Sequence, residues 1–284
     1  MGVTTGAPAE PDPELDATIV VKRRPGQAAR LRAEAAHLRA VAGDGVVPLR
    51  RVASDGSEVE LHLEAAAGSL ADVLFERGRL FEPEVRAVGV AAAAALTRLH
   101  EAGLVHADVK PANLLLSSDG ELWLADLDAA RRADGRPLPR GTPGRVRNDA
   151  AATTAVDVLA LAVMVVELAT GVVPDPSARW TRQDLIGLEC PPGLAADIAT
   201  VLSVSTPPTL AELADRLGQG DRGDLPTPAR LERGTDPTPT LDFDPVICAP
   251  AIRPRPSARP DDLSVMLIVL VLVVLAVVAA GVAL

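Results

Sequence analysis

The feature that most constrains this chain is a short apolar stretch, LVHADVKPANLLL at residues 104–116, that is interrupted in its middle. Within eight positions the interruption places His106, Asp108, Lys110, Pro111 and Asn113. At usages of about 5% per residue type, chance would produce these five types at these spacings roughly once in ten thousand chains of this length. The pattern therefore favours a functional loop over an incidental polar loop between two buried elements.

Composition divides the chain into four parts. Residues 1–16 are acidic and proline-rich, and residues 17–217 carry the apolar periodicities of a folded domain. Residues 218–262 are dense in Pro, Asp, Thr and Arg, and we expect a disordered linker because such a segment buries too little apolar surface to offset its ordering entropy. Residues 263–284 contain no charge, and at 1.5 Å rise per residue they span roughly 33 Å, enough to cross a hydrocarbon core of about 30 Å. We predict a transmembrane helix there.

Charges near the predicted span indicate its orientation. Arg253, Arg255 and Arg259 precede it and no charged residue follows. By the positive-inside rule, everything before the span lies in the cytoplasm. The sequence thus predicts a single-pass protein of the cell membrane that is anchored at its C-terminus. The net charge of −10 argues against a nucleic-acid partner, which would need a basic patch.

Residues 17–217 predict an α+β protein with two lobes, a small strand-rich one followed by a helical one. Hydrophobic periodicity and turn residues carry this prediction. The expected elements are a strand at 17–22, helices at 28–42, 69–77, 83–102 and 154–170, and hairpins at 46–64 and 113–126.

The interrupted segment resembles the catalytic loop of eukaryotic-like, bacterial Ser/Thr protein kinases. The resemblance implies that Asp108 is the base that accepts the proton of a substrate hydroxyl. It also implies that Lys110, which has the Ser/Thr-kinase spacing from the aspartate, neutralises the transferred phosphate, and that Asn113 holds a magnesium ion. ATP and Mg²⁺ are the cofactors that this resemblance implies.

Other motifs of the same family occur at the expected distances. LADLDAA places Asp126 where the family has the metal-binding Asp of D-F-G. IVVK resembles the family's V-A-I-K strand and offers Lys22 as the phosphate-positioning lysine, with Glu34 twelve residues later as its ion-pair partner. GTPG implies a substrate-binding role for Thr142 near Asp108. The apolar helix at 155–174 resembles the family's central helix, with Asp157 in the place of a buried Asp that bonds the catalytic loop.

The chain departs from the family at three places. The 21 residues before Lys22 contain no G-x-G-x-x-G, so we expect either a start further upstream or a nucleotide site without that loop. Ala107 replaces an arginine that receives an activation-loop phosphate in many kinases, and no Ser, Thr or Tyr lies between Asp126 and Thr142. Activity should therefore not depend on phosphorylation there. Asp128 replaces the glycine of D-F-G; its carboxylate could bind metal or face solvent, and we expect it to face solvent.

These features predict a membrane-anchored Ser/Thr protein kinase that transfers the ATP γ-phosphate to protein substrates, which the sequence does not name. One alternative is a pseudokinase that acts as a membrane-tethered binding module. Another is a small-molecule phosphotransferase of the aminoglycoside-kinase kind, whose D-x-D motif resembles DLD here. An in-frame glycine-rich strand upstream would argue against the pseudokinase, and phosphoryl transfer that requires Asp108 would support the protein kinase.

Overall fold

The computed structural model describes residues 19–55, 57–138, 145, 147, 150–204 and 206–228. The acidic N-terminus, Thr142, most of the predicted linker and the predicted span at 263–284 lie outside these ranges. Within them, no helix combines the length and the apolar character that membrane crossing requires.

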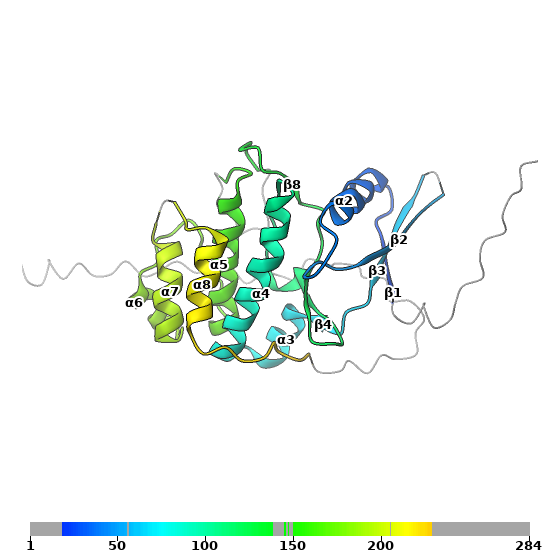
Figure 1. The fold of residues 1–284 in the computed structure, drawn as a ribbon. Helices are drawn as coiled ribbons and strands as arrows, with labels where there is room; N and C mark the ends of the chain where they lie inside the picture. Colours follow the sequence, from blue (N-terminus) through cyan, green and yellow to red (C-terminus); the bar gives the residue numbers. More distant parts are fainter. Residues whose placement is uncertain are drawn as a thin grey trace, which may run out of the picture. The chain divides into compact units, whose positions relative to one another are not determined.

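The N-terminal part is an antiparallel sheet with one helix packed against it (Figure 1). Strands β1 (Ile19–Arg23), β2 (Leu49–Ser54) and β3 (Val59–Glu64) follow the order β1-β3-β2. Branched residues dominate β1, as a pleated, half-buried position favours. Helix α2 (Ala28–Ala40) buries Leu31, Ala35 and Leu38, which share one face, and packs against β2 and β3.

A short strand and two helices continue the chain. They are β4 (Gly68–Ser69), α3 (Leu70–Arg77) and α4 (Glu82–Glu101). Ser69 caps α3 as expected, because its hydroxyl accepts a hydrogen bond from Asp72 N–H while the Asp72 carboxylate returns to Ser69 N–H. Gly103, with φ of +71°, follows the end of α4.

Small strands frame the interrupted segment. Strand β5 (Leu104–Val105) forms its first two residues and pairs with β8 (Arg131–Arg132). The 3₁₀ turn η1 (Pro111–Asn113) lies within it, and β6 (Leu114–Leu116) pairs with β4 and with β7 (Leu122–Leu124). The β6–β7 hairpin turns at Gly120, whose φ is +84°, as predicted.

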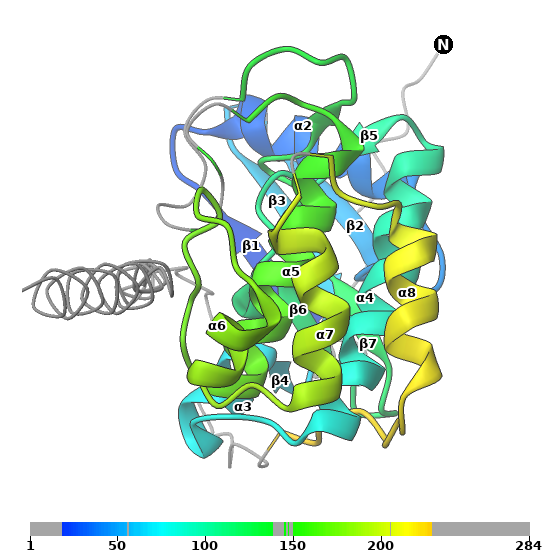
Figure 2. The same cartoon turned by 90° about the vertical axis from the view of Figure 1, so that its left-hand side faces the viewer.

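The C-terminal part consists of helices around a buried central one. These are α5 (Thr154–Thr170), α6 (Arg182–Gly187), α7 (Pro192–Leu202) and α8 (Leu210–Gln219). Helix α4 packs against α5 and α8, and α5 packs against α7; Figures 1 and 2 show these four helices running side by side. Thirteen of the 17 residues of α5 are buried, so this helix forms the centre of the core.

The helices, strand and hairpins expected from the sequence are all present, with bounds that differ by at most three residues at most ends. The described chain continues past α8 along α4, where Gly223 N–H donates to the carbonyl of Pro83 at 3.1 Å. The predicted domain boundaries remain predictions, because most of the linker lies outside the described residues.

Candidate active site

The central helix holds the backbone of the interrupted segment. Asp157, which is fully buried on α5, accepts hydrogen bonds from His106 N–H and Ala107 N–H, both at 2.8 Å. His100 Nε2 lies 2.9 Å from the same carboxylate. Ala107 has a φ of +63°, a left-handed conformation that costs a non-glycine residue about 1–2 kcal/mol. The buried carboxylate thus supplies the bonds that hold a strained loop, as the resemblance implied for Asp157.

Three predicted site residues meet within this loop. Lys110 Nζ lies 2.7 Å from Asp108 Oδ2, and Asn113 Nδ2 donates to the Asp108 carbonyl at 2.8 Å and to Asp108 Oδ2 at 3.2 Å. The side chains of Asp108 and Lys110 are 16% and 24% exposed, so both reach solvent, whereas Asn113 is buried. The arrangement offers an accessible carboxylate beside an accessible ammonium group.

A second cluster brings together residues from three distant stretches. Lys22 Nζ, on β1, lies 2.7 Å from Glu34 Oε1 on α2 and 2.7 Å from Asp126 Oδ1. All three side chains are largely buried. Lys22 and Asp126 are separated by 104 residues in the chain, so the fold brings together two groups that the sequence places far apart.

Ala125 connects the two clusters. Its N–H donates to the Asn113 carbonyl at 2.9 Å, and its own carbonyl lies 3.0 Å from His106 Nε2. Asp126 follows directly, with a φ of +58°. Both backbone groups of Ala125, the residue before the D-L-D segment, therefore contact the catalytic loop.

The two acids around Lys22 differ in their electrostatics. Burial opposes ionisation of Asp126, but the charge and hydrogen bond of Lys22, with help from Arg24, outweigh it and lower the pKa of Asp126. For Glu34, burial prevails over Lys22 and raises the pKa above its ordinary value. Of the two acids, Asp126 therefore loses its proton more readily, and the ionised carboxylate is the form that a metal ion binds.

The structure overturns the expectation that Asp128 faces solvent. Its side chain is only 10% exposed and pairs with two arginines. Arg24 Nη1 lies 2.7 Å from Asp128 Oδ2, and Arg30 contacts both carboxylate oxygens, through Nε at 3.0 Å and through Nη2. The physical reason is that Arg24, directly after β1, and Arg30, on α2, lie beside Asp128 in the fold. A sequence motif alone does not indicate which charges will lie next to it.

The donor atoms fit a magnesium ion bound together with a nucleotide. Among the described residues, Asn113 Oδ1 is a buried acceptor without a hydrogen-bond partner, and such an atom is costly unless a ligand uses it. The same ranges contain no cluster of three or more His, Cys, Asp or Glu side chains able to hold a metal ion. Magnesium in phosphoryl-transfer sites takes one or two protein oxygens plus substrate phosphates, and Asn113 and Asp126 could supply those oxygens.

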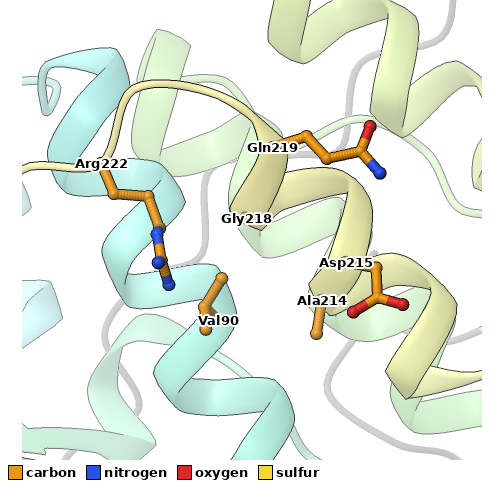
Figure 3. Close-up of a pocket in the computed structure, with 6 residues that line it drawn as sticks. All are labelled: Val90, Ala214, Asp215, Gly218, Gln219 and Arg222. Carbon is orange, nitrogen blue, oxygen red and sulfur yellow. The ribbon is translucent and has the colours of Figure 1, made fainter.

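One predicted site residue and one surface hollow lie apart from this constellation. Thr142 falls outside the described residues, so its role stays a prediction. A hollow of about 390 Å³ lies between α4 and α8, and none of the predicted site residues lines it (Figure 3). Its lining consists of Val90, Ala214, Asp215, Gly218, Gln219 and Arg222.

Comparisons with known proteins agree with the geometry. Serine/threonine-protein kinase PknL of Mycobacterium tuberculosis is 35% identical over 156 residues, which cover 51% of this chain and 39% of that protein. CBL-interacting serine/threonine-protein kinase 24 of Arabidopsis thaliana is 28% identical over 183 residues, or 60% of this chain and 41% of that protein. 3-Phosphoinositide-dependent protein kinase 1 of Arabidopsis thaliana is 38% identical over 88 residues, or 31% and 18%.

The matched region spans less than half the length of each of these relatives. The family description "Protein kinase domain" matches residues 18–188, which is more than half of the chain and contains both clusters described above. With its catalytic loop, its D-L-D segment and its lysine–glutamate pair all inside that match, this chain belongs to the protein kinase domain family.

Proposed function

We propose that this chain is a Ser/Thr protein kinase that uses ATP and Mg²⁺ to phosphorylate hydroxyl groups of protein substrates. The observation that carries the proposal is the meeting of Lys22, Glu34 and Asp126 next to the loop that bears Asp108, Lys110 and Asn113. Family membership and the Ser/Thr kinases among the relatives support it.

Each residue has a defined task in this reaction. The Asp108 carboxylate orients the attacking hydroxyl and accepts its proton, and the neighbouring Lys110 ammonium group neutralises charge on the transferred phosphoryl group. Lys22, fixed between two carboxylates, positions the nucleotide phosphates. Asn113 and Asp126 would hold magnesium, which when bound would supply neutralising positive charge to the phosphates. Phosphoryl transfer needs positioning and charge more than covalent chemistry.

Transfer of label from γ-labelled ATP to a generic protein substrate tests the proposal. The full chain is purified in detergent and incubated with Mg²⁺, and wild type is compared with Asp108→Asn. The matched control is Asp215→Asn, which makes the same change at an exposed position of α8. Transfer by wild type and by the control, but not by Asp108→Asn, would support the kinase. Stabilisation by ATP in a thermal unfolding assay without any transfer would instead indicate the pseudokinase.

We also propose that residues 263–284 anchor the chain in the cell membrane, with the kinase domain in the cytoplasm. The uncharged 22-residue segment and the three arginines that precede it support this topology. Membrane fractionation of cells that express the full chain and a chain lacking residues 263–284 tests it. Recovery of both chains in the supernatant, or protection of the kinase domain from protease added to the cytoplasmic face, would contradict it.

A further inference from the structure

One face of α2 lies along the D-L-D segment. Arg30, Glu34 and His37 are spaced i, i+4, i+7, so they share that face. Each reaches the segment of residues 126–128: Arg30 bonds Asp128, Glu34 shares Lys22 with Asp126, and His37 Nδ1 lies 3.3 Å from the Leu127 carbonyl. We name this row of contacts the α2 seam.

Asp128 carries most of the charge-assisted bonding in the α2 seam. Its two carboxylate oxygens together take one bond from Arg24, at the end of β1, and two from Arg30, in the first turn of α2. The α2 seam otherwise contains a single bond to a backbone carbonyl and the shared lysine. Asp128 is only 10% exposed and Arg24 21%, so solvent screens the Arg24 bond less than it would at the surface; Arg30 is 58% exposed, and its bonds are screened more.

The start of α2 needs an external anion. Its first turn has no acidic residue, its N-cap residue Gln27 makes no side-chain cap, and Arg30 places a cation near the positive end of the helix dipole. The Asp128 carboxylate compensates this charge. Arg24 Nη2 also lies 3.4 Å from Asp126 Oδ1, so Arg24 contacts both acids of the D-L-D segment.

We propose that Asp128 is a positioning residue that holds α2, and through it the Lys22–Glu34 pair, in the arrangement that binds nucleotide phosphates. It supplies a permanent negative charge to the α2 seam, so that no phosphorylated side chain is required there. Consistent with this role, the chain has no Ser, Thr or Tyr between Asp126 and Thr142. The part of this inference that concerns nucleotide and transfer rests on the proposed kinase function.

Hydrogen exchange of the full chain, measured without nucleotide, tests the positioning role separately from catalysis. Asp128→Asn keeps the shape of the side chain and removes its charge, and we expect the amides of Ala28–Ala40 to exchange about 10- to 100-fold faster, as the loss of charge-assisted bonds implies. Exchange in α5 should be unchanged. Asp128→Glu should recover most of the protection because it restores the carboxylate.

Two further variants keep the test sharp if Asp128→Asn folds poorly. Arg30→Gln removes the arginine of the α2 seam, whose side chain is 58% exposed, and should also speed exchange of α2. Arg39→Gln removes the same charge nine residues later, at an exposed position on the opposite side of α2, and should leave the N-terminal half of the helix as in wild type.

Kinetics complete the test. We expect Asp128→Asn to lower kcat/KM for ATP by about tenfold or more, and Arg39→Gln to leave it unchanged. Unaltered α2 exchange in both Asp128→Asn and Arg30→Gln would overturn the inference whether or not the protein transfers phosphate. If exchange is faster in these variants but the wild-type chain transfers no phosphate, the positioning role is supported and the kinase proposal is refuted.

Discussion

Replacement of Asp157 by asparagine should loosen the catalytic loop more than any other isosteric change in the helical part. The carboxylate accepts from two backbone N–H groups, at 2.8 Å each, and lies 2.9 Å from His100 Nε2. An amide has one oxygen in place of two, so it can satisfy Ala107 N–H or His106 N–H but not both. The other N–H would face an NH₂ group in a fully buried position.

The magnitude follows from these contacts. A buried N–H without an acceptor costs about 1–3 kcal/mol, and exchanging a charged for a neutral acceptor weakens the remaining bond by about 1 kcal/mol. Relaxation of Ala107 from its left-handed conformation would return part of its strain of about 1–2 kcal/mol. We therefore expect Asp157→Asn to lower the free energy of unfolding by about 2–3 kcal/mol.

Urea unfolding of the full chain in detergent, followed by the fluorescence of Trp123 and Trp180, measures this loss. With a slope of about 2–3 kcal/mol/M for a domain of this size, the midpoint should fall by about 1 M. Asp215→Asn on the exposed face of α8 should stay within about 0.5 kcal/mol of wild type. A cost below about 1 kcal/mol for Asp157→Asn would refute the view that this carboxylate holds the loop.

Three more changes test other parts of the structure. Arg145→Met strands Glu167, to which Arg145 makes two buried bonds of 2.5 Å, and should cost about 3–5 kcal/mol in urea unfolding; adding Glu167→Leu should recover much of it, and a small cost for Arg145→Met alone would contradict the pairing. Gly171→Ala places a Cβ 2.8 Å from a backbone oxygen at a φ of +74°, whereas Gly103→Ala, at +71°, meets nothing within 4 Å. In both variants strain should lower the free energy of unfolding by about 1–2 kcal/mol, and in Gly171→Ala the close contact should lower it by at least about 1 kcal/mol more. Equal losses in the two variants would disprove the close contact. Burial, and to a lesser extent the charge of Glu82, raises the pKa of the Cys190 thiol to about 12. In a Cys248→Ser variant, which leaves Cys190 as the one cysteine of the sequence, alkylation at pH 8 should therefore be negligible until urea unfolds the protein. Because the unfolded thiol ionises near its ordinary pKa of 9.0 and the native thiol does not, stability should fall as pH rises above that value; fast alkylation of the native chain would refute the burial.

Local sequence patterns predicted the catalytic loop, the hairpin that follows it and the helix that supports it. Each of these lies within one continuous stretch, where the backbone geometry fixes which positions along the chain share a face or a turn. Lys22, Glu34 and Asp126 could also be predicted, since a family motif marks each of them. Asp128 was predicted wrongly because its partners Arg24 and Arg30 lie about 100 residues away.

The ion pairs of Asp128 with Arg24 and Arg30, and the Arg145–Glu167 pair, had no counterpart in the motifs. The i, i+4, i+7 spacing of Arg30, Glu34 and His37 was a signal that could have indicated the α2 seam. No comparable pattern marks the Arg145–Glu167 pair, whose members lie 22 residues apart. Contacts of this kind depend on how separate elements pack, and hydrophobic periodicity carries no information about which charges meet.

Helix α5 bears only two ionisable side chains, and each bonds a different partner. Asp157 accepts hydrogen bonds from the catalytic loop, and Glu167 pairs with Arg145. The two residues are ten positions apart, so at 1.5 Å per residue they lie about 15 Å apart along the helix axis. The helix therefore sets the distance between the carboxylate that holds the catalytic loop and the carboxylate that binds Arg145. Inserting or deleting one residue between Asp157 and Glu167 would turn one carboxylate by about 100° relative to the other, so the two contacts together constrain the length of this part of the helix.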